Sequence, residues 1–223
     1  MIPWHNVDTV LLDMDGTLLD LHFDNYFWLH HLPVRYAQAH NVSEAQAKQI
    51  LDEHIRAHEG TLKWYCLEYW SNALRLNIRH LKEEVKHKIQ IRPFAVELLQ
   101  RLRQLNKKVV LITNAHPQSL QLKLEVTAID KWLDLVISSH QLQHPKENQE
   151  FWRLLHVQEP FDPQRTLFVD DTPRILAAAR DFGIRYLLCI RQPDSQNNRR
   201  DIADFPAIDH FDEILPSLTV TAR

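Results

Sequence analysis

The chain has 223 residues, of which 44% are hydrophobic and 25% are charged, a composition typical of a folded globular protein with one substantial core. Lysine and arginine number 26 against 29 aspartates and glutamates, so the formal net charge is -3. This balance provides no basic field for a nucleic-acid backbone and argues against nucleic acid as a partner.

The sequence also argues against a membrane-bound or secreted protein. No segment approaches the roughly 18 apolar residues of a membrane span, and the first residues, MIPWHNVDTV, lack the basic and apolar regions of a signal peptide. The two cysteines, Cys66 and Cys189, form no CxxC pair and are expected to be free thiols in a reducing compartment. We therefore expect a soluble, cytoplasmic protein.

In chain order, five short apolar runs predict the strands of a sheet. Runs this apolar are typical of parallel strands buried on both faces. They cover residues 10–14, 109–113, 133–138, 166–170 and 186–190. Helical patterns between the later runs follow Pro93, Pro117, Lys146 and Pro173. The alternation predicts an α/β fold with a doubly wound parallel sheet.

Residues 21–90 differ from the rest because they carry helical periodicity and no credible strand. The helical pattern breaks near residues 41–43, near 60–61 and at Asn77. Such a segment is too long for a crossover and predicts an inserted α-helical cap, with residues 1–20 and 91–223 forming the α/β core. Neither GxGxxG nor GxxxxGK[ST] occurs, which argues against nucleotide binding by a dinucleotide fold or a P-loop.

The strongest chemical signal is the string DMDGT, residues 13–17, at the end of the first predicted strand. Ligands in open α/β sheets bind beyond the carboxyl ends of the strands. Two carboxylates so close predict a hard divalent metal, most simply Mg²⁺, with Asp13 and Asp15 among its ligands. Asp13 is the candidate nucleophile for an aspartyl-phosphate intermediate, and Asp15 the candidate general acid and base. The alternative is an acidic turn that caps the next element.

A second acidic pair, Asp170 and Asp171, ends the fourth predicted strand, where it could complete the metal site or merely cap the following helix. Thr113 and Asn114 close the second strand, where a hydroxyl group and helix N–H groups could bind phosphate or a helix cap could form. Lys146 stands at a predicted helix start, an unfavourable place for a cation, and could neutralise phosphate oxygens or simply face solvent.

The order of these motifs resembles that of the haloacid dehalogenase superfamily over essentially the whole chain: DxDGT, then a threonine, a lysine and an acidic pair, each after a predicted strand. The place of the insert resembles members with a C1 cap. The resemblance implies that Asp13 is the nucleophile, Asp15 the acid/base, Thr113 and Lys146 phosphate binders, and Asp170 a metal ligand. The second aspartate is typical of the phosphatases of the superfamily rather than its dehalogenases.

Within that superfamily, the stretches LLDMDGTLLDL, FDNYFW, TLKWYCLEYW, LITNAHP and TLFVDD resemble the bacterial GMP/IMP nucleotidase branch. This implies a purine 5′-nucleotide as substrate, cleaved to nucleoside and phosphate. One departure is the NKK sequence at 106–108, where many relatives have a glycine, and we expect Asn106 to supply the left-handed turn.

Substrate selectivity is expected to come from the cap, since the phosphate site is common to all substrates. Trp64 and Tyr69 could stack on a purine, although packing within the cap explains aromatic residues at helical spacing at least as well. Asn25 and Tyr26 enter the cap near the first motif, and His116 follows the second, so each is a candidate substrate contact whose alternative is capping or packing.

Three other interpretations stay open. A phosphatase of a sugar phosphate or another small phosphomonoester would use the same machinery with a different cap pocket. A phosphate-receiving signalling domain and a binding protein without catalysis are more remote, because the acidic motifs would stand in another order or be incomplete. A histidine pair, His54 and His58, has the i, i+4 spacing of a zinc site but lacks an evident third ligand and is expected to face solvent.

Overall fold

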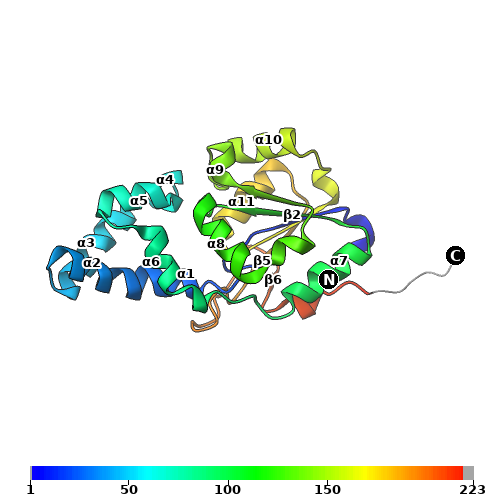
Figure 1. Cartoon of the computed structure of the whole chain (residues 1–223). Coiled ribbons are helices and arrows are strands. Elements are labelled where there is room, and N and C mark those ends of the chain that lie inside the picture. Colours follow the sequence, from blue (N-terminus) through cyan, green and yellow to red (C-terminus); the bar gives the residue numbers. More distant parts are fainter. Residues whose placement is uncertain (1, 218–223) are drawn as a thin grey trace.

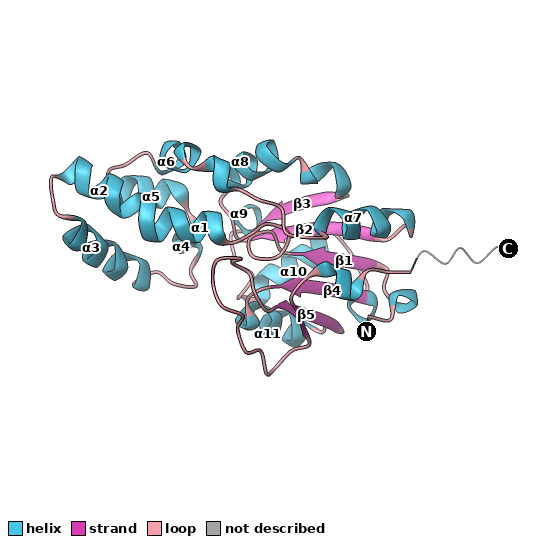
Figure 2. Ribbon diagram, turned by 90° about the horizontal axis from the view of Figure 1, so that it is seen from below, coloured by secondary structure: helices cyan, strands magenta, loops and turns pink. Residues whose placement is uncertain are grey.

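A computed structural model describes residues 2–217 (Figure 1). It contains a six-stranded, wholly parallel sheet in the order β3-β2-β1-β4-β5-β6, and Figure 2 shows the strands from β3 to β5 side by side. The strands are β1 (Thr9–Leu12), β2 (Lys108–Thr113), β3 (Leu135–Ser138), β4 (Thr166–Asp170), β5 (Tyr186–Ile190) and β6 (Ala207–Ile208). The first five agree with the predicted runs to within a few residues at each end, whereas the two-residue β6 was not predicted. The predicted core extends to residue 223, and residues 218–223, like residue 1, lie outside the described part.

The sheet is buried on both faces, as its apolar strands require. Alternate side chains of the central strand β1 enter opposite cores: Val10 and Leu12 pack with the helices of one face, and Leu11 with those of the other. The first face is covered by α7 (Ala95–Gln104) and α8 (Pro117–Thr127), and the second by α10 (Gln149–Gln158) and α11 (Pro173–Phe182). The short helix α9 (Ser139–Leu142) follows β3. The predicted doubly wound α/β fold is therefore confirmed.

Prolines begin two of these helices as predicted, with Pro117 and Pro173 in the first turns of α8 and α11. The prediction for α10 was wrong by three residues, because the helix begins at Gln149 rather than at Lys146. The side chain of Asn148 accepts a hydrogen bond from the Glu150 N–H group and so caps the helix. Lys146 consequently lies in the loop before α10.

The insert contains α1 (His22–Tyr26), α2 (Leu32–His40), α3 (Glu44–Arg56), α4 (Leu62–Tyr65), α5 (Leu67–Leu74) and α6 (Ile78–Glu84). A π-helical turn over Phe27–His31 joins α1 to α2. The predicted breaks are present: Asn41 is left-handed at the end of α2, Ser43 caps α3, and Asn77 caps α6. Asn106 also adopts the expected left-handed conformation, with a φ of 51°.

The insert leaves and re-enters the core at one place. Asp20 N–H donates to the Gln90 carbonyl, and Arg92 N–H donates to the Leu18 carbonyl, each at 2.9 Å. The helices α1–α6 gather beyond one end of the sheet, the end reached by the carboxyl termini of its strands (Figure 2). This arrangement supports a division of the chain after residue 20 and after residue 90, which we retain as a proposal.

Among residues 2–217, no helix combines the length and the apolar character needed to cross a membrane. Cys66 and Cys189 are both free thiols, the first half-buried and the second buried.

Candidate active site

The carboxyl ends of three adjacent strands bring the predicted polar residues together. Asp13 follows β1, Thr113 ends β2, and Asp170 ends β4, and β1 lies between the other two strands. The chain crosses from β1 to β2 on one side and later returns to place β4 on the other. A sheet has its natural ligand site at such a change of direction.

Three carboxylates form the centre of this site. Asp13, Asp170 and Asp171 each present an oxygen within 4.8 Å of the others, and all three residues are buried. Burial raises the pKa of each to about 6, a rise that Lys146 opposes and the neighbouring carboxylates reinforce. Side-chain oxygens so grouped favour a hard cation such as Mg²⁺.

Lys146 reaches this group from the loop before α10. Its Nζ atom donates to Asp13 Oδ1 at 2.5 Å and to Asp170 Oδ2 at 2.7 Å, and only 1% of the side chain is exposed. Burial would lower the pKa of the lysine, but the two carboxylates raise it above its usual value, so it remains charged. The solvent-facing alternative for Lys146 is therefore wrong.

Gly16 makes the turn after Asp13 possible. Its φ of +87° lies in the left-handed region, and a Cβ atom there would stand 2.8 Å from Asp171 Cγ and 2.9 Å from Pro193 Cβ. Glycine is required both for the backbone conformation and for the close approach of the second acidic pair.

Asp15 belongs to a different charge network. Its Oδ1 atom accepts a hydrogen bond from Lys123 Nζ at 2.6 Å. We predicted Asp15 as a fourth metal ligand, but the residue does not belong to the three-carboxylate group. Lys123 also binds Asp24 at 2.6 Å, and Asp24 binds Lys82 at 2.7 Å. Asp24 and Lys82 lie in the insert, so the network crosses from core to cap.

The proton affinities in this network are strongly perturbed. Burial raises the pKa of Asp15 to about 6, with Lys123 opposing the rise and Asp24 and Asp13 adding to it. Burial also acts to raise the pKa of Asp24, but Lys123 and Lys82 together hold it well below its usual range. Asp15 therefore combines access to the cavity with a pKa near neutrality, as a general acid and base requires.

The side chain of Asn114 is occupied by hydrogen bonds within the protein and is not free to bind phosphate. Its Oδ1 atom accepts from Lys146 N–H at 2.9 Å, and its Nδ2 atom donates to Glu147 at 2.9 Å. Glu147 also accepts from the Tyr65 hydroxyl in α4 at 2.9 Å. These bonds fix the loop that carries Lys146. Thr113 Oγ1 accepts from the Ala115 N–H group at 3.0 Å and lines the same cavity.

A cavity of about 360 Å³ opens from the carboxylates toward the insert, a volume within the usual range for small-molecule sites. Three of the predicted substrate residues, Asn25, Trp64 and His116, line it. The other two do not: Tyr26 stacks on His30, and Tyr69 packs against His58.

Several residues of the cavity wall were not predicted. No sequence pattern distinguishes them, because they lie inside helices, where an apolar or basic side chain usually serves packing or solubility. They are Trp28, Leu29, Tyr65, Lys82, Lys123 and Arg174.

The geometry defines a class of protein: a doubly wound α/β domain with an acidic site at its switch point and a helical insert above it. A family model for haloacid dehalogenase-like hydrolases matches residues 7–183. The chain belongs to this family, as the order of its motifs predicted.

Two curated relatives are similar along nearly their whole length. The GMP/IMP nucleotidase YrfG of Escherichia coli K12 is 41% identical over 217 residues, which are 97% of this chain and 98% of that protein. The protein of the same name from Shigella flexneri has the same identity and coverage. These similarities confirm the predicted branch of the superfamily.

Solved structures share the fold at lower identity. A haloacid dehalogenase-type phosphatase from Thermococcus onnurineus matches with a TM-score of 0.74 and 20% identity, over 90% of this chain and 93% of that one. The hydrolase YfnB of Bacillus subtilis, whose structure contains magnesium, matches with a TM-score of 0.66 and 19% identity, over 93% and 96% of the two chains.

Proposed function

We propose that the protein is a Mg²⁺-dependent phosphomonoester hydrolase that cleaves purine 5′-nucleotides, GMP and IMP, to nucleoside and phosphate through a phosphorylated Asp13. The observation that carries this proposal is the 41% identity to GMP/IMP nucleotidases over 97% of the chain. The acidic site at the floor of the cavity supports it independently.

The residues present suit a magnesium ion. Asp13, Asp170 and Asp171 would hold it, because their oxygens converge and oxygen is the ligand that Mg²⁺ prefers. Asp13 Oδ2 is buried and has no hydrogen-bond partner among the residues that the structure describes, so a ligand-binding atom is available. The ion would neutralise charge on the phosphoryl group and lower the repulsion between anionic substrate and carboxylates.

Asp13 is placed to attack phosphorus because Lys146 fixes one of its oxygens. In the first step an Asp13 oxygen forms a bond to phosphorus, the bond from phosphorus to the nucleoside oxygen breaks, and Asp15 gives its proton to that oxygen. In the second step Asp15 takes a proton from water as the water oxygen attacks phosphorus. The bond to Asp13 then breaks, which releases phosphate and restores the carboxylate.

Lys146 and Thr113 would bind the phosphoryl oxygens, since both line the cavity beside Asp13. Asn114 acts as a positioning residue that holds the Lys146 loop. The nucleoside would occupy the part of the cavity nearer the insert, where Trp64 offers an aromatic face and Asn25 offers an amide group.

Phosphate release from GMP, IMP, AMP, pyrimidine monophosphates and sugar phosphates in Mg²⁺ tests the proposal, with Asp13→Asn as the inactive control. Asp8→Asn is the matched control, because Asp8 pairs with Arg165 outside the cavity. GMP and IMP should be hydrolysed fastest by the unaltered protein and by Asp8→Asn. Preference for a sugar phosphate would overturn the substrate assignment and leave the reaction type intact. Activity that survives Asp13→Asn would refute the nucleophile.

We further propose that the protein acts in the cytoplasm and on a free small molecule. Two unpaired cysteines suit a reducing compartment, and the net charge of -3 offers no field for nucleic acid.

A further inference from the structure

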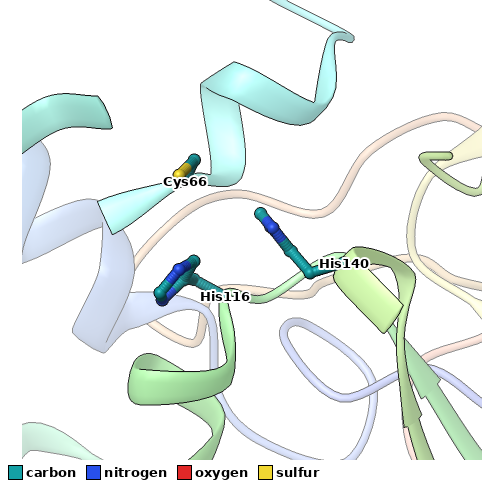
Figure 3. A group of neighbouring side chains, drawn as sticks. All are labelled: Cys66, His116 and His140. Carbon is teal, nitrogen blue, oxygen red and sulfur yellow. The ribbon is translucent and has the colours of Figure 1, made fainter. Parts of the chain in front are cut away.

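A second group of potential metal ligands lies near the carboxylates but has a different chemistry. Cys66, His116 and His140 each present one ligand atom, and the three atoms lie within 4.8 Å of one another (Figure 3). Tetrahedral zinc with thiolate and imidazole ligands spaces such atoms about 3.3–3.6 Å apart, so side-chain shifts of about 1 to 1.5 Å at most would complete the geometry.

The three ligands come from both parts of the molecule. Cys66 precedes α5 in the insert, His116 precedes α8 in the core, and His140 lies in α9 of the core. Figure 3 shows the side chains directed into the space between these segments. An ion bound there would link the insert to the core.

Cys66 is the sulfur ligand of this group and stands at the start of α5. It is the N-cap residue of α5, and its Sγ atom accepts a hydrogen bond from the Tyr69 N–H group at 3.4 Å. Thiolate is the form that binds metal.

The two histidines are kept in their neutral, metal-binding form. Burial lowers the pKa of His116, and burial together with His116 lowers the pKa of His140 to about 4. The rings pack edge to face with centroids 4.9 Å apart. His140 Nε2 is buried and, among residues 2–217, has no hydrogen-bond partner, which leaves a donor atom for a cation.

His116 has one competing interaction. Its Nδ1 atom accepts a long hydrogen bond, 3.3 Å, from the Gln118 N–H group. Ligation through Nε2 would put the proton on Nδ1 and give up this contact, whose length indicates a small cost.

We propose that Cys66, His116 and His140 form a site for a borderline-soft divalent cation of the zinc class, separate from the carboxylate site, which bridges the insert and the core. Thiolate and imidazole ligands select such ions, whereas Mg²⁺ prefers oxygen. Three protein ligands leave a fourth position open. Because His116 also lines the substrate cavity, that position borders the space that the substrate would occupy.

Cobalt provides a direct probe, since a cobalt–thiolate bond gives a charge-transfer band in the near ultraviolet. We would titrate Co²⁺ into the full chain in saturating Mg²⁺ and a non-thiol reductant, and then displace it with Zn²⁺. The site predicts a band that saturates at one equivalent and disappears as Zn²⁺ binds. Removal of a ligand in Cys66→Ser or His140→Gln should weaken binding by at least about 10- to 100-fold.

Matched controls separate this site from other thiols and imidazoles. Cys189→Ser removes the other cysteine, and His144→Gln removes a half-buried histidine near the end of α9. Both should keep the band and the affinity. Thermal unfolding without added metal checks that each variant is folded, and the Tm of the unaltered chain should rise with Zn²⁺ while that of Cys66→Ser should not.

Three results would overturn the proposal: no charge-transfer band with millimolar Co²⁺, a band that survives Cys66→Ser, or an affinity that His140→Gln leaves unchanged. None of these readouts depends on phosphate release, so this proposal is tested independently of the proposed function.

Discussion

Replacement of Gly16 by alanine should damage the active site in a way that can be calculated from two features of the turn. The first is the φ of +87°, a left-handed conformation that costs an ordinary residue about 1–2 kcal/mol. The second is the new Cβ atom, which would stand 2.8 Å from Asp171 Cγ and 2.9 Å from Pro193 Cβ. Real Cβ atoms do not approach so closely, so Asp171 and Pro193 or the turn that carries Asp13 must shift, and we expect the carboxylate group to be disturbed.

Gly183 offers the matched control. It is also left-handed, with a φ of +109°, but a Cβ atom there meets nothing within 4 Å. Gly183→Ala therefore carries the conformational cost alone, about 1–2 kcal/mol of stability, and leaves the carboxylates in place.

Urea unfolding, Mg²⁺ binding by calorimetry and phosphate release would be measured for both variants. Each should lose stability, with Gly16→Ala losing more, and only Gly16→Ala should lose Mg²⁺ affinity and kcat, by about tenfold or more, as expected when a metal ligand or its support is displaced. Equal Mg²⁺ affinities in the two variants would refute the steric argument.

Four further predictions concern the remaining parts of the site. Lys123→Met removes a buried cation and leaves two half-buried carboxylates, Asp15 and Asp24, without a shared partner, so urea unfolding should show a loss of about 3–5 kcal/mol; a loss below about 1 kcal/mol would contradict the pairing. The pKa of Asp24 in the folded protein lies below its unfolded value near 3.8, so its contribution to stability is present above pH 4 and is lost as pH falls through the folded pKa. In Asp24→Asn the free energy of unfolding should therefore depend less steeply on pH in the acid range. Mg²⁺ at 100 times its Kd should stabilise the protein by about 2.7 kcal/mol, and Asp170→Asn should abolish the rise in Tm. Trp64→Ala should raise KM for GMP more than it lowers kcat, by the equivalent of about 1–3 kcal/mol, if the ring stacks on the base; an unstable variant with unchanged KM would assign Trp64 to cap packing.

The sequence predicted the carboxylate centre well because each of its parts follows a strand. In a parallel sheet the carboxyl ends of neighbouring strands meet at one edge, so Asp13, Thr113 and Asp170 had to converge once the strands were recognised. Lys146 was recognised for another reason, because a cation is unfavourable at a predicted helix start. Its helix begins later than predicted because Asn148 supplies the cap.

The charge network and the second ligand group could not be predicted in the same way. Lys123 lies within a helix, where a lysine is usually solvated, and only the three-dimensional structure brings it to Asp15. Cys66, His116 and His140 have no common spacing, since they come from three separate elements, whereas the regularly spaced His54 and His58 belong to no ligand group among the described residues. The strand β6 has only two residues and is too short for a pattern.

The ion network from Lys82 to Asp15 couples the state of protonation to the position of the insert. Asp24 belongs to the insert, and its charge helps to raise the pKa of Asp15 in the core. Any movement that carries Asp24 away leaves Lys123 paired with Asp15 alone and lowers the proton affinity of the acid. By reciprocity, a proton on Asp15 favours the arrangement in which Asp24 is in place. Under the proposed mechanism, the arrangement with Asp24 in place would therefore favour the protonated Asp15 that the leaving oxygen needs, and loss of that contact would favour release of the proton to solvent.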